Sequence, residues 1–156
     1  MIEYLTNDLL TVNHGVIAHG CNCQGKMGAG IAKAIRKKWP SVYYAYVDKC
    51  FSTTNRRSML GDAQLVPVSH TPFGQLFVAN LFTQERYGRE PIRYADPNAI
   101  KTALRKVVMS CANRDLPLYM SKIVCSLGGL SWVDDVEPIV RELNDELNIP
   151  IYVCTK

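Results

Sequence analysis

Residues 16–32 read VIAHGCNCQGKMGAGIA and contain the clearest secondary-structure signals of the chain. Val16 to His19 form a near-continuous apolar run, which is typical of a strand buried on both faces of a parallel or mixed sheet. A glycine-bearing turn follows, and from Gly28 onward the apolar residues recur at helical spacing until Pro40 ends the helix. The stretch therefore predicts a strand, a loop and a helix in succession, which is the repeating unit of α/β folds.

Strand and helix signals alternate in the same way along the rest of the chain. We predict further strands at Ile2–Leu5, Ala63–Val68, Gln75–Leu81, Ile123–Cys125 and Ile151–Cys154, with the hairpin Ala63–Val68/Gln75–Leu81 turning around Pro72 and Gly74. We predict further helices from Ser41 to about Cys50, from Asp96 and Pro97 through Cys111, and from Val133 to Leu147. This order predicts an α/β fold with a mixed, mostly parallel sheet that is covered by helices on both faces.

Length and composition indicate one compact unit. The 156 residues, 47% of them hydrophobic and 21% charged, can fill one core, so we predict a single domain over residues 1–156. The net charge of +4 suits anionic small molecules but is small for a nucleic-acid-binding protein, so we expect no direct nucleic-acid binding. No apolar run is long enough for a membrane span and Met1 to Tyr4 do not resemble a secretion signal, so we expect a cytoplasmic protein without a membrane partner.

Six cysteines are present, at Cys21, Cys23, Cys50, Cys111, Cys125 and Cys154. Four of them lie in apolar or periodic segments, and no secretion signal accompanies them. We therefore expect reduced thiols that act as small buried hydrophobic side chains.

Two loops leave the strand ends at which ligands bind in α/β folds. One runs from Gly20 to Gly30, the other runs from Ser126 to Trp132, and both contain glycine and lead into predicted helices. In the first loop small residues allow a ligand to approach the backbone closely, and the N–H groups at the helix start can hold a phosphate. A tight turn that binds nothing has the same pattern, and the loop matches neither the dinucleotide-binding nor the triphosphate-binding glycine motif.

Several polar residues near these strand ends have both a chemical and a structural interpretation. Asn22 can hold a sugar diol or close a turn on its own backbone, and Asp8 can accept from an exocyclic amine or cap a short turn. His19 can act as an acid or base, or it can be a hydrogen-bonded core imidazole. Cys21 and Cys23 are candidate nucleophiles or zinc ligands, but the H-x-C-x-C pattern lacks a second ligand pair and nothing nearby lowers a thiol pKa.

Residues 16–32, taken together with Asp8, resemble the first ligand loop of the macro domain family and its adenine-reading aspartate. Residues 125–132, CSLGGLSW, are similar to the second, phosphate-holding loop of that family, and the resemblance covers nearly the whole chain. It implies a three-layer α/β/α fold with ADP-ribose in a cleft at the strand ends: adenine at Asp8, the diphosphate between the loops and the distal ribose near Asn22. The ligand-binding residues that it implies are Asp8, Leu9, Cys21, Lys26, Gly28, Ala29, Gly30, Ile31, Cys125, Ser126, Leu127, Gly128, Gly129 and Leu130.

The first loop resembles two hydrolytic branches of the family. One removes phosphate from ADP-ribose 1''-phosphate, and the other is a glycohydrolase that removes ADP-ribose from glutamate or from DNA bases. Glutamate-directed glycohydrolases have a nucleophilic lysine after the hairpin and an aspartate in the second loop, where this chain has Gln84 and Ser131. Ala32 replaces the acidic residue that is common after the first loop's glycines. Because Gln84 cannot form a Schiff base and Ser131 is a weak proton acceptor, the sequence favours the phosphatase unless Lys26 substitutes as nucleophile.

For the phosphatase reaction we expect His19 and Asn22 to be the catalytic residues. Asn22 would hold the distal ribose, His19 would act as general base or orient the water, and the amides of Ser126 to Leu130 would offset phosphate charge. The missing carboxylates keep a non-catalytic ADP-ribose reader as an alternative, and an unrelated nucleotide-binding α/β protein also stays open. The expected partner is ADP-ribose or its 1''-phosphate, with ADP-ribosylated macromolecules as a further class, and no metal or cofactor is expected. Arg86 to Tyr94 form a candidate lid or an ordinary surface turn.

Overall fold

The computed structural model describes residues 1–72, 74–88, 92, 94–122 and 129–155, and within them it contains a six-stranded sheet. The strands are β1 (Ile2–Leu5), β2 (Gly15–Asn22), β3 (Ala63–Thr71), β4 (Gly74–Gln84), β5 (Leu118–Met120) and β6 (Ile151–Cys154). Their order across the sheet is β1-β6-β5-β2-β4-β3, and among these strands only β3 runs antiparallel to its neighbour. The carboxyl ends of the five parallel strands therefore meet at one edge of the sheet.

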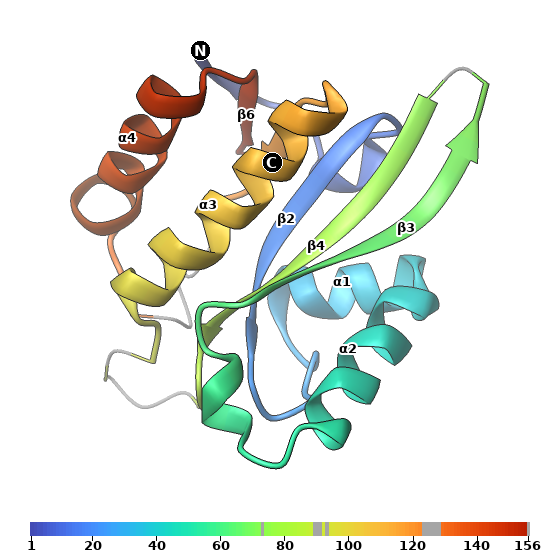
Figure 1. The fold of residues 1–156 in the computed structure, drawn as a ribbon, viewed down its shortest axis with the longest axis vertical. Helices are drawn as coiled ribbons and strands as arrows, with labels where there is room; N and C mark the ends of the chain where they lie inside the picture. The colour runs from blue at the N-terminus through green and yellow to red at the C-terminus, as the bar shows by residue number, and fades with distance from the viewer. Residues whose placement is uncertain (73, 89–91, 93, 123–128, 156) are drawn as a thin grey trace.

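Helices cover both faces of the sheet. They are α1 (Gly30–Lys38), α2 (Pro40–Ser52), α3 (Pro97–Arg114) and α4 (Glu137–Leu147). In Figure 1, α3 and α4 lie to the left of β2, whereas α1 and α2 lie to the right, below the long β3–β4 hairpin. The two helix pairs also belong to separate apolar clusters. This three-layer α/β/α arrangement confirms the predicted fold class.

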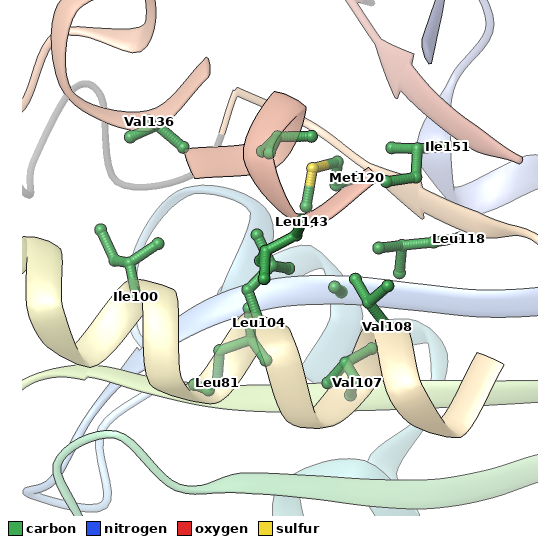
Figure 2. Packing of buried hydrophobic residues seen from close by; sticks show 14 of the residues in the cluster. Leu81, Ile100, Leu104, Val107, Val108, Leu118, Met120, Val136, Leu143 and Ile151 are labelled. Atoms are coloured by element: carbon green, nitrogen blue, oxygen red, sulfur yellow. The ribbon is translucent and has the colours of Figure 1, made fainter. Parts of the chain in front are cut away.

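Alternate residues of the central strands supply both cores. Val16 and Ala18 of β2 pack with α3 and α4, while Ile17 packs in the cluster of α1 and α2, as the two-residue period of a strand requires. Figure 2 shows Leu104 of α3 and Leu143 of α4 pointing toward each other above the sheet. The strand that carries the predicted ligand loop is thus packed on both faces.

The structure confirms most of the predicted elements. The hairpin of β3 and β4 is antiparallel as predicted, and α3 begins where expected because Asp96 caps it, accepting from the Asn98 N–H at 2.9 Å, with Pro97 at the first helical position. The predicted final helix begins as a π-helical turn, η3 (Trp132–Val136), before α4.

One strand was missed in the sequence. β5 occupies Leu118–Met120, directly after Pro117, and three residues are too few for a periodic pattern to stand out. The strand predicted at Ile123–Cys125 lies outside the described residues. As β5 pairs with both β2 and β6, it completes the parallel part of the sheet.

Two further expectations concern the state of the cysteine thiols and the absence of a membrane-spanning segment. Cys21, Cys23, Cys50, Cys111 and Cys154 are all buried and free of disulfides, which confirms the prediction of reduced thiols for the described part of the chain; Cys125 lies outside it. Among the described helices, none combines the length and the apolar character that a membrane crossing requires.

Candidate functional site

The carboxyl edge of the parallel strands gathers the predicted site residues. β1 ends three residues before Asp8, β2 ends at Asn22 inside the first loop, and β4 ends at Gln84. The register places Asn22 opposite Gln84. Leu130 lies just beyond the part of the second loop that falls outside the described residues, which includes Cys125, Ser126, Leu127 and Gly128. Segments far apart in the sequence thus meet at one edge, as a ligand site at strand ends requires.

Asn22 organises the first loop. Its side-chain oxygen accepts hydrogen bonds from the Gln24 N–H at 2.9 Å and from the Tyr46 hydroxyl at 2.7 Å, and its amide nitrogen donates to the Lys26 carbonyl at 2.9 Å. The residue is only 8% exposed. Asn22 therefore closes a turn on its own loop, and one N–H of its side-chain amide remains for a ligand.

Tyr46 of α2 holds the same loop through hydrogen bonds of its hydroxyl. Its hydroxyl lies 2.7 Å from both the carbonyl oxygen and the side-chain oxygen of Asn22 and can donate its single proton to one of them at a time, and it accepts from the N–H groups of Gly25 and Lys26, each at 3.1 Å. Burial raises the pKa of this hydroxyl, so it stays protonated. The loop is tied through one side chain to the middle of a packed helix.

The sequence analysis missed Tyr46. A weak signal was available, because Val42, Tyr46 and Cys50 recur at a spacing of four on the buried face of α2. A buried tyrosine hydroxyl usually needs a hydrogen-bond partner. The partner itself, more than twenty positions earlier in the chain, carries no signature in the helix.

The start of α1 presents unpaired backbone donors. Ala29 precedes the helix in extended conformation without a side-chain cap, and Gly30 adopts a φ of +58°, which favours glycine. Within the described residues nothing accepts from the N–H groups of Gly30, Ile31 and Ala32, the donors that a helix leaves free in its first turn. Gly28 and Gly30 are exposed, and a Cβ at either would meet no atom within 4 Å. This helix start can hold a phosphate.

Lys26 is exposed four residues before the first residue of this helix, so a cation adds to the unpaired N–H groups. Ile31 is half-buried. Ala32, where a carboxylate is common in the resembling family, packs against the cluster that contains Tyr46. The loop therefore offers positive charge and backbone donors but no acidic side chain of its own.

His19 lies inside the molecule. It is 0% exposed, and its Nε2 lies 2.5 Å from the side-chain oxygen of Asn80, the residue opposite it on β4. The Asn80 amide donates to Gln64 on β3 at 3.0 Å, and the Gln64 amide donates to the Ala45 carbonyl of α2 at 3.0 Å. Three strands and a helix are thus joined by one row of polar side chains, of which His19 and Asn80 are buried and Gln64 is half-buried.

Burial determines the charge of His19. It lowers the pKa of the imidazole to about 4, although the Asn80 hydrogen bond acts in the opposite direction, so the ring is neutral at pH 7. A general base must reach the proton that it removes, and this ring has no exposed surface. The structure thus favours the core interpretation of His19 over the role of a base in direct contact with substrate.

The cysteines of the loop are not activated. Cys21 is buried with its Sγ 3.6 Å from His19 Nε2, and burial raises its thiol pKa well above the ordinary range. Burial likewise raises the pKa of Cys23 to about 12. Thiols in this state are poor nucleophiles. The described residues hold no group of three or more histidines, cysteines or carboxylates that could bind a metal ion.

Asp8 is exposed at the sheet edge and has a local structural task. One carboxylate oxygen accepts from the Leu10 N–H at 2.9 Å and so caps the short helix η1 (Leu9–Thr11). The second oxygen has no hydrogen-bond partner among the described residues, which leaves it able to accept from a ligand amine. Leu9 is buried and packs in the cluster of α1 and α2.

The end of the second loop is also anchored. Gly129 is exposed with a φ of +77°, and Leu130 packs into the core of α3 and α4. The Ser131 hydroxyl accepts from the Asp134 N–H at 3.3 Å, so it caps η3. The Trp132 indole N–H donates to the Tyr4 hydroxyl at 2.9 Å. Ser131 therefore serves the backbone where the resembling glycohydrolases use an aspartate.

The segment after β4 was proposed as a lid. Gln84 donates to the Arg86 carbonyl at 2.7 Å and pairs with Ala95 across the base of the segment. Residues 89–91 and 93 lie outside the described residues, so the lid stays a prediction.

Parallel strands that end at a glycine loop, followed by a helix with unpaired N–H groups, define a class of α/β proteins that hold phosphate-bearing ligands at strand ends. Residues 18–139 match the Macro domain model, and the chain belongs to this family. A Debaryomyces hansenii protein named ADP-ribose 1''-phosphate phosphatase is 30% identical, over 98% of this chain and 99% of its own length.

Solved structures agree with this membership. A Bacteroides thetaiotaomicron protein of unknown function is similar with a TM-score of 0.87 and 27% identity, covering 100% of this chain and 98% of that one. A macrodomain protein from Streptomyces coelicolor is similar with a TM-score of 0.78 and 27% identity, covering 100% of this chain and 99% of that one. The likeness extends over whole chains.

Proposed function

We propose that this chain binds ADP-ribose and hydrolyses ADP-ribose 1''-phosphate to ADP-ribose and inorganic phosphate. The observation that carries the proposal is the full-length similarity to a curated phosphatase of that name, combined with the open, donor-rich start of α1. Residues 1–156 act as a single domain in this proposal. The buried free thiols fit a reducing compartment, so we place the activity in the cytoplasm.

In the proposed complex the diphosphate lies on the N–H groups at the start of α1, where the helix dipole adds attraction. The family resemblance assigns Cys125 to Leu130 to the diphosphate as well, and most of these residues lie outside the described part of the structure. The free N–H of Asn22 donates to the distal ribose, and Lys26 lies near the 1''-phosphate. Asp8 accepts from the adenine amine through the oxygen that does not cap η1.

His19 acts as a positioning residue in this proposal. Its bond to Asn80 fixes the end of β2, from which Asn22 and the loop continue. Changing His19 to Ala should then reduce turnover strongly and weaken ADP-ribose binding only modestly, because the ligand contacts themselves remain while the loop loses one of its supports. Loss of both turnover and binding, with the fold intact by circular dichroism, would assign His19 to structure alone.

The experiment that tests the function is a phosphorus NMR time course of ADP-ribose 1''-phosphate with the purified protein. Growth of the inorganic phosphate signal, absent with an Asn22→Asp variant, would establish the phosphatase. Asn22→Asp keeps an oxygen to accept from Tyr46 but replaces the amide donor with negative charge beside the phosphate. A perturbed but intact ligand would instead favour the reader or a glycohydrolase for another linkage, and an unperturbed spectrum would contradict ADP-ribose binding.

A matched pair of variants tests the Asp8 assignment. Asp8→Ala removes both the cap and the adenine acceptor, whereas Asp8→Asn retains an oxygen for the Leu10 N–H and turns an amide donor toward adenine. If Asp8 reads adenine, both variants should weaken ADP-ribose binding by about 1–3 kcal/mol, the scale of a hydrogen bond to a charged partner. If capping η1 is the sole task of Asp8, calorimetry should find weakened ADP-ribose binding for Asp8→Ala but unchanged binding for Asp8→Asn.

A further inference from the structure

Charge is distributed unevenly along this chain. Residues 26–57 contain eight of the 18 lysines and arginines but one of the 14 aspartates and glutamates, so this segment has a net charge of +7 and the remaining chain has −3. The basic residues of the segment are Lys26, Lys33, Arg36, Lys37, Lys38, Lys49, Arg56 and Arg57. The net charge of +4 is an average over the whole chain. It therefore understates the positive charge that one face of the molecule presents to an anionic ligand.

The segment forms the layer of α1, α2 and the short helix η2 (Arg56–Met59); in Figure 1, α1 and α2 lie on the right-hand side and η2 lies lower, toward the centre. Within the described residues, two of its eight cations form ion pairs: Lys49 with Asp62 and Arg57 with Glu85. Lys38 donates to the Leu10 carbonyl. The other cations of the segment form no ion pair with a described residue, and its one acidic residue, Asp48, is exposed on α2 between Tyr44 and Phe51.

Aromatic rings alternate with these cations. The Arg36 guanidinium lies 3.8 Å from the centre of the Tyr43 ring, and that of Arg56 lies 4.4 Å from the centre of the Phe51 ring. Tyr44 is 68% exposed and Phe51 is 62% exposed, although large aromatic side chains usually bury most of their surface. We name this surface, made by Arg36, Lys37, Tyr44, Phe51 and Arg56, the basic–aromatic platform.

The platform borders the first ligand loop. A Cβ built on Gly25 would lie 3.0 Å from Cε2 of Phe51, so the exposed ring covers the backbone of the loop. Gly25 is also the residue whose N–H donates to Tyr46. A long ligand on the platform would thus reach the proposed ADP-ribose site without leaving the surface.

We propose that the basic–aromatic platform binds single-stranded nucleic acid. Cations without carboxylate partners attract a phosphate backbone, and exposed rings between them can stack with unpaired bases. An acidic peptide would use the cations but would gain little from flat aromatic faces. The inference does not rest on phosphatase activity, because oligonucleotide binding is measured without ADP-ribose.

Fluorescence anisotropy with labelled dT20 and rU20 tests the proposal on the full chain at several salt concentrations. We expect affinity that falls with salt. An Arg36→Gln/Lys37→Gln variant should bind about tenfold more weakly near 0.1 M salt and should lower the log–log salt slope by about 1.4, because each phosphate contact on a single strand contributes about 0.7. Tyr44→Ala should weaken binding about fivefold or more, since one stacking partner is lost.

The matched control is Lys101→Gln/Arg105→Gln, which removes the same charge from α3, where both cations pair with carboxylates of α4 on the other face of the sheet. It should leave oligonucleotide affinity within about twofold, and thermal melts should show that all variants fold. An equal loss in the control would reduce the effect to overall charge and overturn the proposal. Absence of oligonucleotide binding at 50 mM salt would also overturn the proposal. So would a polyglutamate peptide that binds more tightly than the oligonucleotides and whose affinity does not change in Tyr44→Ala.

Discussion

Strands β2 and β4 present two different faces to the helices that cover them. Toward α3 and α4 they place small and branched apolar side chains such as Ala18 and Leu81. Toward α2 they place His19 and Asn80, which extend through Gln64 to the helix backbone. The first face stabilises the fold through buried apolar area. The second also fixes the orientation of its side chains relative to α2, because hydrogen bonds require particular geometry.

The ligand loop belongs to the second face. Next to the row, which ends on the Ala45 carbonyl, Tyr46 of the same helix bonds to Asn22, so the position of the loop depends on a set of directed hydrogen bonds to α2. Stability and ligand positioning are therefore separable in this fold. Changes on the α3–α4 face should alter the free energy of unfolding, and changes on the α2 face should alter binding and pH dependence.

The largest effect is expected for Leu104→Ala on the α3–α4 face. Leu104 is completely buried between α4 and the sheet (Figure 2), and truncation of such a leucine lowers the free energy of unfolding by about 2–5 kcal/mol. Urea denaturation measures this loss, and calorimetry on the folded variant should find ADP-ribose affinity within about twofold of the wild type. A large loss of affinity in the folded variant would show that the two faces are coupled.

On the α2 face, His19 should make stability depend on pH. Its folded pKa of about 4 lies below the ordinary 6.5, so the unfolded chain binds a proton that the folded chain excludes between these values. The stability contribution is therefore complete above pH 6.5 and is lost as pH falls toward 4, by roughly 3 kcal/mol.

Denaturation curves across pH 4–7 measure this slope. A His19→Gln variant retains an amide near Asn80 but has no titrating ring, so its stability should change less over the same range. His14→Gln, which alters a ring bonded to the Gln75 N–H, is the control and should keep the wild-type slope. Equal slopes for wild type and His19→Gln would refute the assignment to His19.

A smaller effect, on binding, is expected for Tyr46→Phe. The ring and its packing on Phe82 remain, but the loop loses the hydroxyl that joins Asn22, Gly25 and Lys26. ADP-ribose affinity should fall by about 1–2 kcal/mol, because a mobile loop must be ordered on binding. Tyr43→Phe, one turn earlier on α2, is the control, and calorimetry should find it close to wild type.

The same measurements distinguish whether Tyr46 holds the ligand loop in place or only stabilises the fold. If Tyr46 acts through the loop, Tyr46→Phe and Asn22→Asp should be non-additive in ADP-ribose affinity, since they break one network. Additive losses, or a fall in unfolding free energy with unchanged affinity, would make Tyr46 a core residue only.

Local patterns explain what the sequence predicts well. The glycines and apolar periods of residues 16–32 act over a few positions, so the strand, loop and α1 are found where the pattern places them. Asn80 and Gln64 were not identified, because polar residues at alternate strand positions usually face solvent. Here Asn80 is buried and Gln64 half-buried because α2 covers this part of the sheet, and that contact is not encoded in either strand alone. Tyr46 was missed for the same reason.

Thr83 belongs neither to the apolar α3–α4 face nor to the hydrogen-bonded row of the α2 face. Its substitution should have the smallest effect on the free energy of unfolding. It lies at the β-bulge where the register with β2 shifts from Phe82 to Gln84, and its buried hydroxyl has no hydrogen-bond partner in the described part of the structure. Such a group is destabilising, so Thr83→Val should leave the free energy of unfolding unchanged or raise it by up to about 1 kcal/mol. Thr102→Val, which removes a hydroxyl bonded to the Asn98 carbonyl, should instead lower it slightly. If Thr83→Val weakens ADP-ribose binding while the protein stays stable, the hydroxyl serves the ligand, and the site extends beneath the loop along β4.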